Sequence, residues 1–431
     1  MKYRLKDLCS ITKGATGIMK ADGGKYPLVA LGEERKQHSE FQFDAKAVIV
    51  PLISSTGHGH ASMKRVHYQE GKFALGNILC AVIPNNEKQL HPKYLHLYLQ
   101  QFKDSLLVPL MKGAANVSLP MNKLADVEIE VPSYERQLEI IELEDEASGL
   151  KNELEAQLIA QDGDVTKLRQ SILREALQGK LTKQIEKDGN AKDLLRKIKA
   201  EKSKLITEKK LKAEKELPPI KEEEIPFDIP ENWSWCRLGE LVSILGDGLH
   251  GTPNYSSQGD YYFINGNNLI EGKIEMKEKT KRVSEQEFIK HKKEMTNNTV
   301  LVSINGTLGN YAYYNNEKII LGKSACYFNL FNSIDKFYIG ILIQSQYFLK
   351  WASDVASEVT IKNVALKSMR KLLVPLPPLS EQNRIVKRIE QFMQLCDELQ
   401  FSIQQSKIEN EKLLQGALRD ALKKEEVKIT S

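Results

Sequence analysis

The decapeptide LRQSILREAL occupies residues 168–177, and LLQGALRDAL occupies residues 413–422. Six of the ten positions are identical, and the two copies stand 245 residues apart. Shifting the sequence by 245 without a gap aligns 131–177 with 376–422 and gives 13 identities in 47 positions. Shared composition would match about one position in ten, so the agreement favours an internal duplication. Each copy begins with a matching proline and glutamine, Pro132/Pro377 and Gln137/Gln382.

Both repeated segments are predicted to be long helices. In the second, the residues from Ile389 to Ala417 show the alternating three- and four-residue spacing that is typical of paired helices. The same spacing, in the same register, is present in the first copy. We therefore predict that the two helices pack against each other along one seam. The seam is predicted to include Leu154, Leu158, Leu168, Ile172, Leu399, Ile403, Leu413 and Ala417.

The size and composition indicate a soluble protein of several domains. The chain has 431 residues, of which 41% are hydrophobic and 28% are charged. No apolar run approaches the roughly 18 residues of a membrane span, and the start MKYRLKDLCS lacks the apolar stretch of a signal peptide. Five scattered cysteines without a CxxC pair are typical of a reducing compartment. We expect a cytoplasmic protein with no membrane partner.

The regions on either side of the first helix share a running order. YRLKDL (3–8) corresponds to CRLGEL (236–241), and each region continues with a β-branched strand that runs into a glycine-rich turn. We predict an α+β fold in which two mixed α/β heads are separated by long paired (coiled-coil) helices, with a pseudo-twofold internal repeat. The predicted parts are a first head (1–132), a first helix (133–182), a charged and proline-rich linker (183–232), a second head (233–375) and a second helix (376–431).

The linker is expected to be solvated and extended outside one short helical stretch, DLLRKIKAEKSKLI (193–206), because charge blocks and prolines rarely pack. The net charge of the chain is +5, and it lies in the heads and the linker. A weak positive balance of this kind permits binding to nucleic acid without requiring it.

No pattern in the sequence supports catalysis. GDGLHG (246–251) fits a dinucleotide-binding glycine pattern, but no helix is predicted to begin there. His58 and His60 lack further ligands at metal-binding spacing. No nucleophile with a neighbouring base can be assigned. The sequence therefore predicts neither a catalytic residue nor a metal site.

Several segments resemble the specificity subunits of type I restriction–modification systems. VPLPPLSEQNRIVKRI (374–389) resembles the start of their second conserved helix, and LRQSILREALQGKL (168–181) resembles the first. DGLHGTPNY (247–255) and NGTLGNYAYYNNEKIILGKSA (305–325) resemble turns of their target-recognition heads. The first head resembles them only in its order of elements.

The resemblance implies a non-catalytic DNA-binding subunit. Each head would read one part of a bipartite site in double-stranded DNA. The helices would hold the heads apart and dock two modification (methyltransferase) subunits, with restriction (translocase-nuclease) subunits joining them. S-adenosylmethionine, ATP and magnesium would belong to those partners, and this chain would bind no cofactor.

Candidate DNA-contacting residues are expected on loops that follow strands. Base readout requires polar side chains that reach a groove, and phosphate contacts require Lys and Arg. The candidates in the first head are Thr56, His58, His60, Ser62, Lys64 and Arg65. The candidates in the second head are Asp247, His250, Thr252, Tyr255, Asn305, Thr307, Lys323 and Ser324. For any single residue the alternative is an ordinary solvated turn.

Two other classes of protein are alternatives. The first is a stand-alone DNA methyltransferase or nuclease, against which the missing cofactor motifs argue. The second is a coiled-coil scaffold that does not contact DNA.

Overall fold

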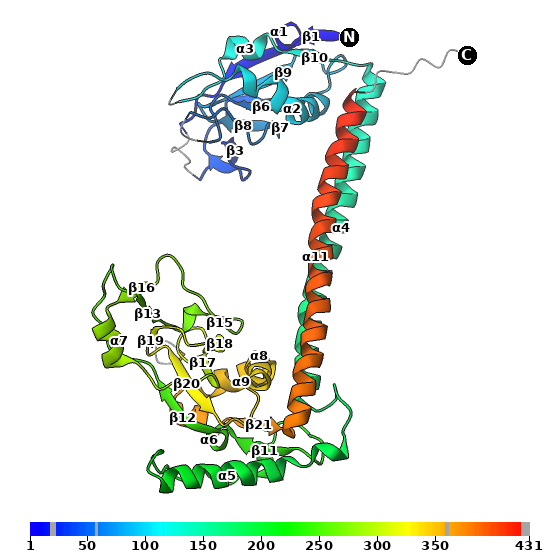
Figure 1. Cartoon of the computed structure of the whole chain (residues 1–431). Coiled ribbons are helices and arrows are strands. Elements are labelled where there is room, and N and C mark those ends of the chain that lie inside the picture. The colour runs from blue at the N-terminus through cyan, green and yellow to red at the C-terminus, as the bar shows by residue number, and fades with distance from the viewer. Residues whose placement is uncertain (18–22, 57–58, 115, 358–361, 424–431) are drawn as a thin grey trace. The chain divides into compact units, whose positions relative to one another are not determined.

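The structure is a computed structural model that describes residues 1–17, 23–56, 59–114, 116–357 and 362–423 (Figure 1). It divides into two compact units. The first unit combines Met1–Ala160 with Ile403–Ser431, and the second is Gln161–Ser402. The division cuts both long helices, α4 (Tyr134–Leu177) and α11 (Leu379–Lys423). Each unit therefore contains one head and part of the helix pair.

The first head is built on two four-stranded sheets. One has the order β2-β9-β6-β7, and the other has the order β4-β3-β8-β5, in which β3 and β8 are parallel. A third pairing, β1 with β10, brings the start of the chain beside the strand that precedes α4. The strands are β1 (Lys2–Arg4), β2 (Cys9–Lys13), β3 (Tyr26–Val29), β4 (Lys36–His38), β5 (Phe43–Asp44), β6 (Ala47–Pro51), β7 (His67–Gln69), β8 (Lys72–Leu75), β9 (Leu79–Pro84) and β10 (Glu128–Glu130). The helices are α1 (Leu5–Leu8), α2 (Pro92–Leu106), the 3-10 turn η1 (Val108–Leu110) and α3 (Met121–Ala125).

The second head has corresponding sheets. Its four-stranded sheet has the order β12-β20-β17-β18, its three-stranded sheet has the order β16-β13-β19, and β11 pairs with β21. The strands are β11 (Ser234–Arg237), β12 (Val242–Asp247), β13 (Tyr261–Ile264), β14 (Leu269–Ile270), β15 (Lys273–Ile274), β16 (Lys281–Val283), β17 (Thr299–Ser303), β18 (Tyr311–Tyr313), β19 (Ile319–Leu321), β20 (Ala325–Leu330) and β21 (Leu373–Leu376). The helices are α6 (Leu238–Leu241), η4 (Gly266–Asn268), α7 (Glu285–His291), α8 (Lys336–Gln344), α9 (Gln346–Val355) and α10 (Leu366–Lys371).

The two heads are therefore copies of one topology, as the running order of the sequence predicted. The parallel pair β3/β8 corresponds to β13/β19, and the central strand β6 corresponds to β17. All five residues are buried both in AVIVP (47–51) and in TVLVS (299–303). These β-branched strands lie in the middle of a sheet, where both of their faces are covered, which explains the apolar run in each.

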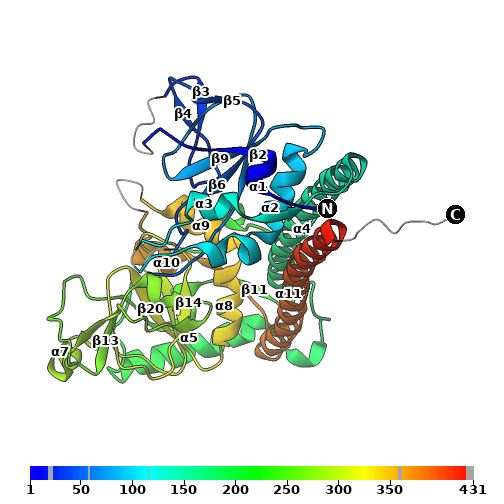
Figure 2. The same cartoon turned by 90° about the horizontal axis from the view of Figure 1, so that it is seen from above.

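The long helices lie side by side in both views of the molecule (Figures 1 and 2). They are antiparallel, because the start of one contacts the end of the other. In the first unit, Arg136 Nη2 of α4 donates to the Ala421 carbonyl of α11 at 3.2 Å. In the second unit, Gln400 Nε2 of α11 donates to Asp162 Oδ1 of α4 at 3.2 Å. None of the described helices is both long enough and apolar enough to cross a membrane.

The predicted seam between the helices is correct only in part. Leu158 and Ile172 are buried, and Leu154 and Ile403 are half-buried. In contrast, Leu168, Leu399, Leu413 and Ala417 are exposed. Towards the end of α11 the buried and half-buried leucines are Leu414, Leu418 and Leu422. Leu418 and Leu422 pack against the core of the first head. A strict heptad seam along the whole pair is therefore wrong for this chain.

The prediction of a solvated linker is also wrong in part. The expected helix is present as α5 (Ala191–Thr207), between the 3-10 turns η2 (Glu186–Asp188) and η3 (Glu222–Glu224), and Ile198 of α5 is buried. Lys202 Nζ of α5 donates to the Gly239 and Val242 carbonyls at 2.9 and 3.1 Å. The buried Arg237 holds the proline-rich part through the Pro218 carbonyl at 2.9 Å. The linker is thus packed onto the second head.

Candidate DNA interface

Four loops meet at one edge of the second head, and backbone hydrogen bonds join them. Gly248 N donates to Ala325 O at 3.1 Å, and Lys323 N donates to Leu249 O at 3.1 Å. The turn after β17 is added to this group by two further bonds. Ile304 N donates to Ser324 O and Gly306 N donates to Lys362 O, both at 3.0 Å. The loops that follow β12, β17 and β19 and the segment before α10 therefore form one edge.

The first head builds the same junction from different residues. Gly14 N donates to Leu79 O at 3.0 Å, and Asn77 N donates to Thr16 O at 2.9 Å. Leu52 N donates to Ile78 O and Ser54 N donates to Val117 O, both at 2.9 Å. Each of these bonds corresponds to one in the second head. The duplication therefore preserved the way in which the loops are held, while the residues displayed on them diverged.

The glycines at this edge are needed for close approach of the backbone. A Cβ on Gly14 would lie 2.2 Å from the Gly76 carbonyl oxygen, and one on Gly248 would lie 2.1 Å from the Gly322 oxygen. No side chain can be added at such distances without moving the backbone. Gly248 belongs to GDGLHG, whose first residues lie in strand β12. The glycine pattern is thus explained by loop packing rather than by a nucleotide.

In the first head, several predicted residues bond to one another. Thr56 Oγ1 and Ser62 Oγ lie 2.8 Å apart, and Ser54 Oγ donates to the His60 carbonyl at 2.6 Å. These hydroxyl groups join residues 54–56, which follow β6, to residues 60–62. The His60 side chain is exposed and available to a ligand. His58 lies outside the described residues.

Lys64 and Arg65 lie beside this loop and give it a positive charge. The Lys64 amide donates to Ser55 Oγ at 2.9 Å, while its side chain is exposed. Arg65 Nη1 lies 2.9 Å from Glu33 Oε2, and this ion pair lowers the pKa of the Glu33 carboxyl group. Arg35, which the sequence analysis did not single out, donates to Gln69 Oε1 at 3.0 Å.

The basic side chains of the first head surround a neutral histidine. Burial lowers the pKa of His67 to about 4, and the positive charges of Arg35 and Arg65 contribute in the same direction. His67 is therefore uncharged near neutral pH. The positive charge at this place comes from Arg35, Lys64 and Arg65, and the Glu33 carboxylate forms an ion pair with Arg65. In the sequence, the charged run EERKQH (33–38) could have indicated Arg35.

In the second head, the predicted residues divide into supporting and displayed ones. Ser324 Oγ accepts from Gly266 N at 2.8 Å, and Asn305 Nδ2 donates to Asn363 Oδ1 at 3.4 Å, so both brace the edge. His250 forms a pair with Asp247. The side chains of Thr307 and Lys323 are exposed at the same edge.

Thr252 and Tyr255 belong to a neighbouring segment. Tyr255 pairs with Val283 of β16, and the Lys281 Nζ atom lies 5.8 Å from the centre of its ring. The adjacent Arg282 guanidinium lies 5.4 Å from the centre of the Tyr262 ring. Lys281 and Arg282 were missed, although the basic run KEKTKR (277–282) could have indicated them. In the first head, the sequence did not lead us to Thr16 and Asn77, whose backbones form part of the loop junction. The match of LGN (75–77) to LGK (321–323) could have indicated Asn77.

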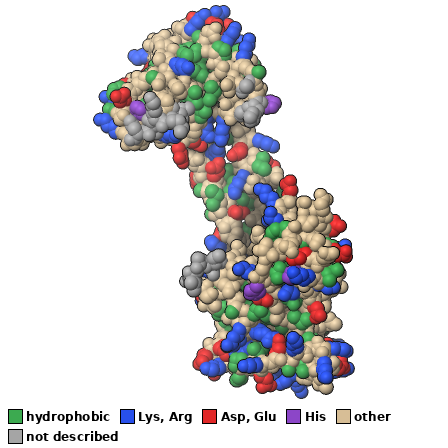
Figure 3. Space-filling model, turned by 90° about the vertical axis from the view of Figure 1, so that its left-hand side faces the viewer, with side chains coloured by type: hydrophobic (Ala, Val, Ile, Leu, Met, Phe, Trp, Pro, Cys, Tyr) green, Lys and Arg blue, Asp and Glu red, His purple; other side chains and the backbone are tan. Residues whose placement is uncertain are grey.

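Charge alone does not distinguish this edge from other surfaces. Lys and Arg side chains also gather over α5, at the lower end of the second unit (Figure 3). Among the residues that the structure describes, no group of three His, Cys, Asp or Glu side chains could hold a metal ion. Cys9, Cys80, Cys236 and Cys326 are buried, and burial raises the pKa of each thiol. The edge is therefore the candidate DNA interface because both heads build it with corresponding backbone hydrogen bonds.

A second surface with a repeated pattern lies on the long helices. Leu150 and Leu395 are equivalent in the duplication and are 68% and 52% exposed. Leu168 and Leu413 are equivalent too and are 44% and 70% exposed. Leu150 and Leu168 are 18 residues apart, as are Leu395 and Leu413, which corresponds to about five helical turns and the same helix face. Apolar residues that are identical in both copies yet exposed indicate a common surface for a partner.

These leucines fall at two levels of the helix pair, one level in each unit. In the first unit, Lys151 and Glu411 line the same small cavity. Leu150 precedes Lys151 and Leu413 lies two residues after Glu411, so the two leucines are at about the same level of the helix pair. In the second unit, Arg169 Nη2 donates to Asp397 Oδ1 at 2.5 Å, which places Leu168 near the level of Leu395. We call Leu150 with Leu413 the first leucine pair, and Leu168 with Leu395 the second leucine pair.

The family model of the type I restriction modification DNA specificity domain matches residues 1–161 and 230–410. The match covers well over half of the chain, in both heads and both helices. The chain therefore belongs to the family of type I restriction–modification DNA specificity subunits.

Two relatives from Escherichia coli illustrate the range of similarity. The type I restriction enzyme EcoAI specificity subunit is 30% identical over 271 residues, which are 61% of this chain and 46% of that protein. The type I restriction enzyme EcoDI specificity subunit is 22% identical over 436 residues, 98% of this chain and 88% of that protein. The aligned part thus spans about half the length of the first relative and most of the second.

Two solved structures share the fold. One comes from work on complex assembly and conformational transition of the type I R-M system, with a TM-score of 0.57 and 16% identity over 98% of this chain and 97% of that chain. The other is the HsdS subunit from Thermoanaerobacter tengcongensis, with a TM-score of 0.53 and 16% identity over 98% and 96%. The predicted α+β architecture of two heads and long helices is confirmed.

Proposed function

We propose that this chain reads a bipartite sequence in double-stranded DNA, one half-site with each head, and that it has no catalytic activity of its own. The observation that carries the proposal is the loop junction, which both heads build with corresponding backbone hydrogen bonds. A rigid edge that displays different side chains suits a reader, because the scaffold positions the loops while the displayed residues choose the bases.

The proposal extends to the partners. Each exposed leucine pair would dock one modification subunit, so that two identical subunits bind one chain, and restriction subunits would join this complex in the cytoplasm. S-adenosylmethionine, ATP and magnesium would be bound by those partners. The duplication supports two docking sites of the same kind, because equivalent surfaces can bind identical partners.

An exchange of heads tests the proposed reading of DNA. Replacing residues 1–132 with the first head of another family member should change one half-site and leave the other unchanged, because each head has its own core and its own loop junction. The measurement is genome-wide mapping of methylated sites in cells that carry the modification subunits. The proposal would fail if both half-sites changed, or if the hybrid assembled normally and neither did.

A smaller change tests the phosphate contacts of the first head. The double substitution Lys64→Ala, Arg65→Ala should weaken DNA binding and reduce the slope of log K against log salt by up to about 1.8, since each lost phosphate contact contributes about 0.9. Fluorescence anisotropy with the assembled complex at several salt concentrations measures both quantities. Lys88→Ala is the matched control, because Lys88 is exposed and follows the opposite end of β9 from the loop junction. Equal slopes for the double variant and the control would show that Lys64 and Arg65 do not contact phosphates.

A further inference from the structure

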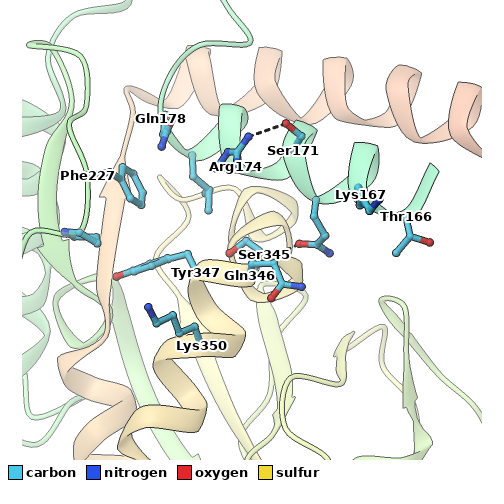
Figure 4. Close-up of a pocket in the computed structure, with 13 residues that line it drawn as sticks. Thr166, Lys167, Ser171, Arg174, Gln178, Phe227, Ser345, Gln346, Tyr347 and Lys350 are labelled. Atoms are coloured by element: carbon cyan, nitrogen blue, oxygen red, sulfur yellow. Dashed lines mark hydrogen bonds between the residues drawn. The ribbon is translucent and has the colours of Figure 1, made fainter. Parts of the chain in front are cut away.

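A groove in the second unit lies between the end of α4, the linker and the start of α9 (Figure 4). Its volume is about 950 Å³, and Leu177, Phe227 and Tyr347 are among the residues that line it. The aromatic side of the groove is braced from behind. The Phe227 ring packs edge-on against the rings of Trp235 and Tyr347, with distances between ring centres of 5.0 and 5.6 Å. Tyr347 Oη donates to the Leu373 carbonyl at 2.9 Å.

The polar part of the lining carries only positive charge. Lys167, Arg174 and Lys350 line the groove, and none of its lining residues is acidic. Arg174 donates to Ser171 Oγ at 2.9 Å, as the dashed line in Figure 4 shows. Lys167 pairs with the exposed Asp164. Lys350 is exposed and has no ion-pair partner among the described residues. An occupant that complements this lining would be negatively charged.

The helical wall of the groove is repeated in the other half of the chain. Four of the α4 residues that line the groove are identical to their equivalents in α11, and Leu177/Leu422 is buried in both copies. The other three identical pairs are Lys167/Lys412, Gln170/Gln415 and Arg174/Arg419.

Burial explains why Leu177 is identical in both copies. Contact with the head explains the same for Gln170, whose Nε2 donates to the Gln344 carbonyl at 3.3 Å. The structure gives no such reason for Lys167 and Arg174, which are exposed, as are Lys412 and Arg419. An exposed cationic side chain retained in both copies indicates a shared ligand.

We propose that this groove binds an acidic peptide segment of the modification subunit, with a bulky apolar side chain seated against Phe227 and Tyr347, and that the repeated Lys412 and Arg419 side chains of α11 contact the same segment of a second copy of that subunit. This inference rests on the proposed docking of that subunit. Continuity supports it, since Leu168 of the second leucine pair follows Lys167 directly in α4. A DNA backbone fits less well, because phosphates match the cations but leave the apolar part unfilled.

Charge reversal at the groove tests the proposal with the full-length chain. Lys350→Glu should weaken binding of purified modification subunits about tenfold at low salt, and Arg174→Glu, Lys350→Glu about a hundredfold, with the difference shrinking as salt is added. Arg419→Glu should act in the same direction through the other copy. Lys290→Glu is the matched control, because Lys290 is an exposed lysine on α7 of the same unit. Isothermal titration calorimetry in the absence of DNA gives the affinities.

The outcomes separate this inference from the proposed function. If the unaltered chain fails to bind modification subunits, the proposed function falls. If it binds them and Lys350→Glu binds as tightly as Lys290→Glu, only the groove proposal is overturned. Intact assembly combined with weaker DNA binding of the assembled Lys350→Glu complex would overturn it in favour of a DNA contact.

Discussion

Replacing both residues of the second leucine pair, Leu168→Asp and Leu395→Asp, should remove one of two modification subunits from the complex and leave the chain folded. Both side chains are exposed in the isolated chain, so the carboxylates would stay in water there. In the proposed complex they would be buried against an apolar partner without a counter-charge, which is strongly unfavourable.

The expected size of this effect follows from burial. Each leucine contributes about 1.5–3 kcal/mol when it is buried, so the loss of two amounts to about 3–6 kcal/mol before any cost of burying charge. At about 1.4 kcal/mol per factor of ten, binding at that site should weaken by about a hundredfold to ten-thousandfold, and the buried charge adds to this loss. Native mass spectrometry at micromolar concentration should then show one modification subunit per chain.

The first leucine pair supplies the complementary experiment. Leu150→Asp with Leu413→Asp should remove the other subunit, and the fourfold variant should bind neither. Ile159→Asp is the matched control, because Ile159 is 65% exposed on α4 yet lies nine residues from Leu150, on the opposite helix face. Its equivalent in the duplication, residue 404, is a glutamine. Retention of both subunits by the second-pair variant, or loss of both from Ile159→Asp, would contradict two independent docking sites.

The duplicated architecture could be predicted from sequence because the signals are local. The three-four spacing and the β-branched runs at 47–51 and 299–303 depend on neighbouring residues, and the repeated decapeptide needs only a comparison of two short segments. Near the end of α11, the predicted seam is wrong because this part of the helix also packs against the first head. Leu413 has the right spacing, but α11 contacts the first head here through Leu418 and Leu422 instead.

The packed linker could not be predicted because its partners are distant in the chain. Arg237 is the main anchor, and it looks like an ordinary charged residue at the end of a strand. Its guanidinium reaches Pro218 O at 2.9 Å and Glu224 Oε2 at 2.9 Å, and these bonds order a segment whose composition predicts solvation. Periodicity contains no information about such a contact.

The candidate interface was predicted as a set of loops rather than as a set of contacts. Strand ends and turns located the loops after β6, β12 and β19 correctly. The sequence could not show that Thr56 and Ser62 bond to each other, or that Ser324 braces Gly266. Polar residues in a turn satisfy the turn first, so the displayed side chains of Lys64, Thr307 and Lys323 are the stronger candidates for DNA contacts.

Replacing the buried glutamine at the start of α11, Gln382→Met, should destabilise the second unit by about 2–6 kcal/mol. Gln382 is fully buried. Its Oε1 accepts from Asp335 N at 2.9 Å, and its Nε2 donates to the Pro377 carbonyl at 2.9 Å. Methionine nearly matches the shape of glutamine but leaves both backbone groups buried without a partner, which costs about 1–3 kcal/mol for each.

The same arrangement at the start of α4 explains why this glutamine is identical in both copies. Gln137 is also fully buried, its Oε1 accepts from His91 N at 2.8 Å, and its Nε2 donates to the Gln89 and Pro132 carbonyls. Asp335 and His91 are the N-caps of α8 and α2. In each unit the glutamine therefore fixes the head helix to the long helix, which would hold a reading head on the helix that docks its partner.

Urea unfolding measures the effect of Gln382→Met, with separate tryptophan and circular-dichroism signals if the units unfold in two steps. Gln391→Met is the matched control on the same helix. Gln391 is exposed, and among the described residues its side chain accepts one surface hydrogen bond, from Arg388 at 3.2 Å, so the loss of this bond should cost less than about 0.5 kcal/mol. Gln137→Met should destabilise the first unit by a similar amount. Equal midpoints for Gln382→Met and Gln391→Met would show that the repeated glutamine does not hold head and helix together, and the duplicated proline and glutamine would then need another explanation.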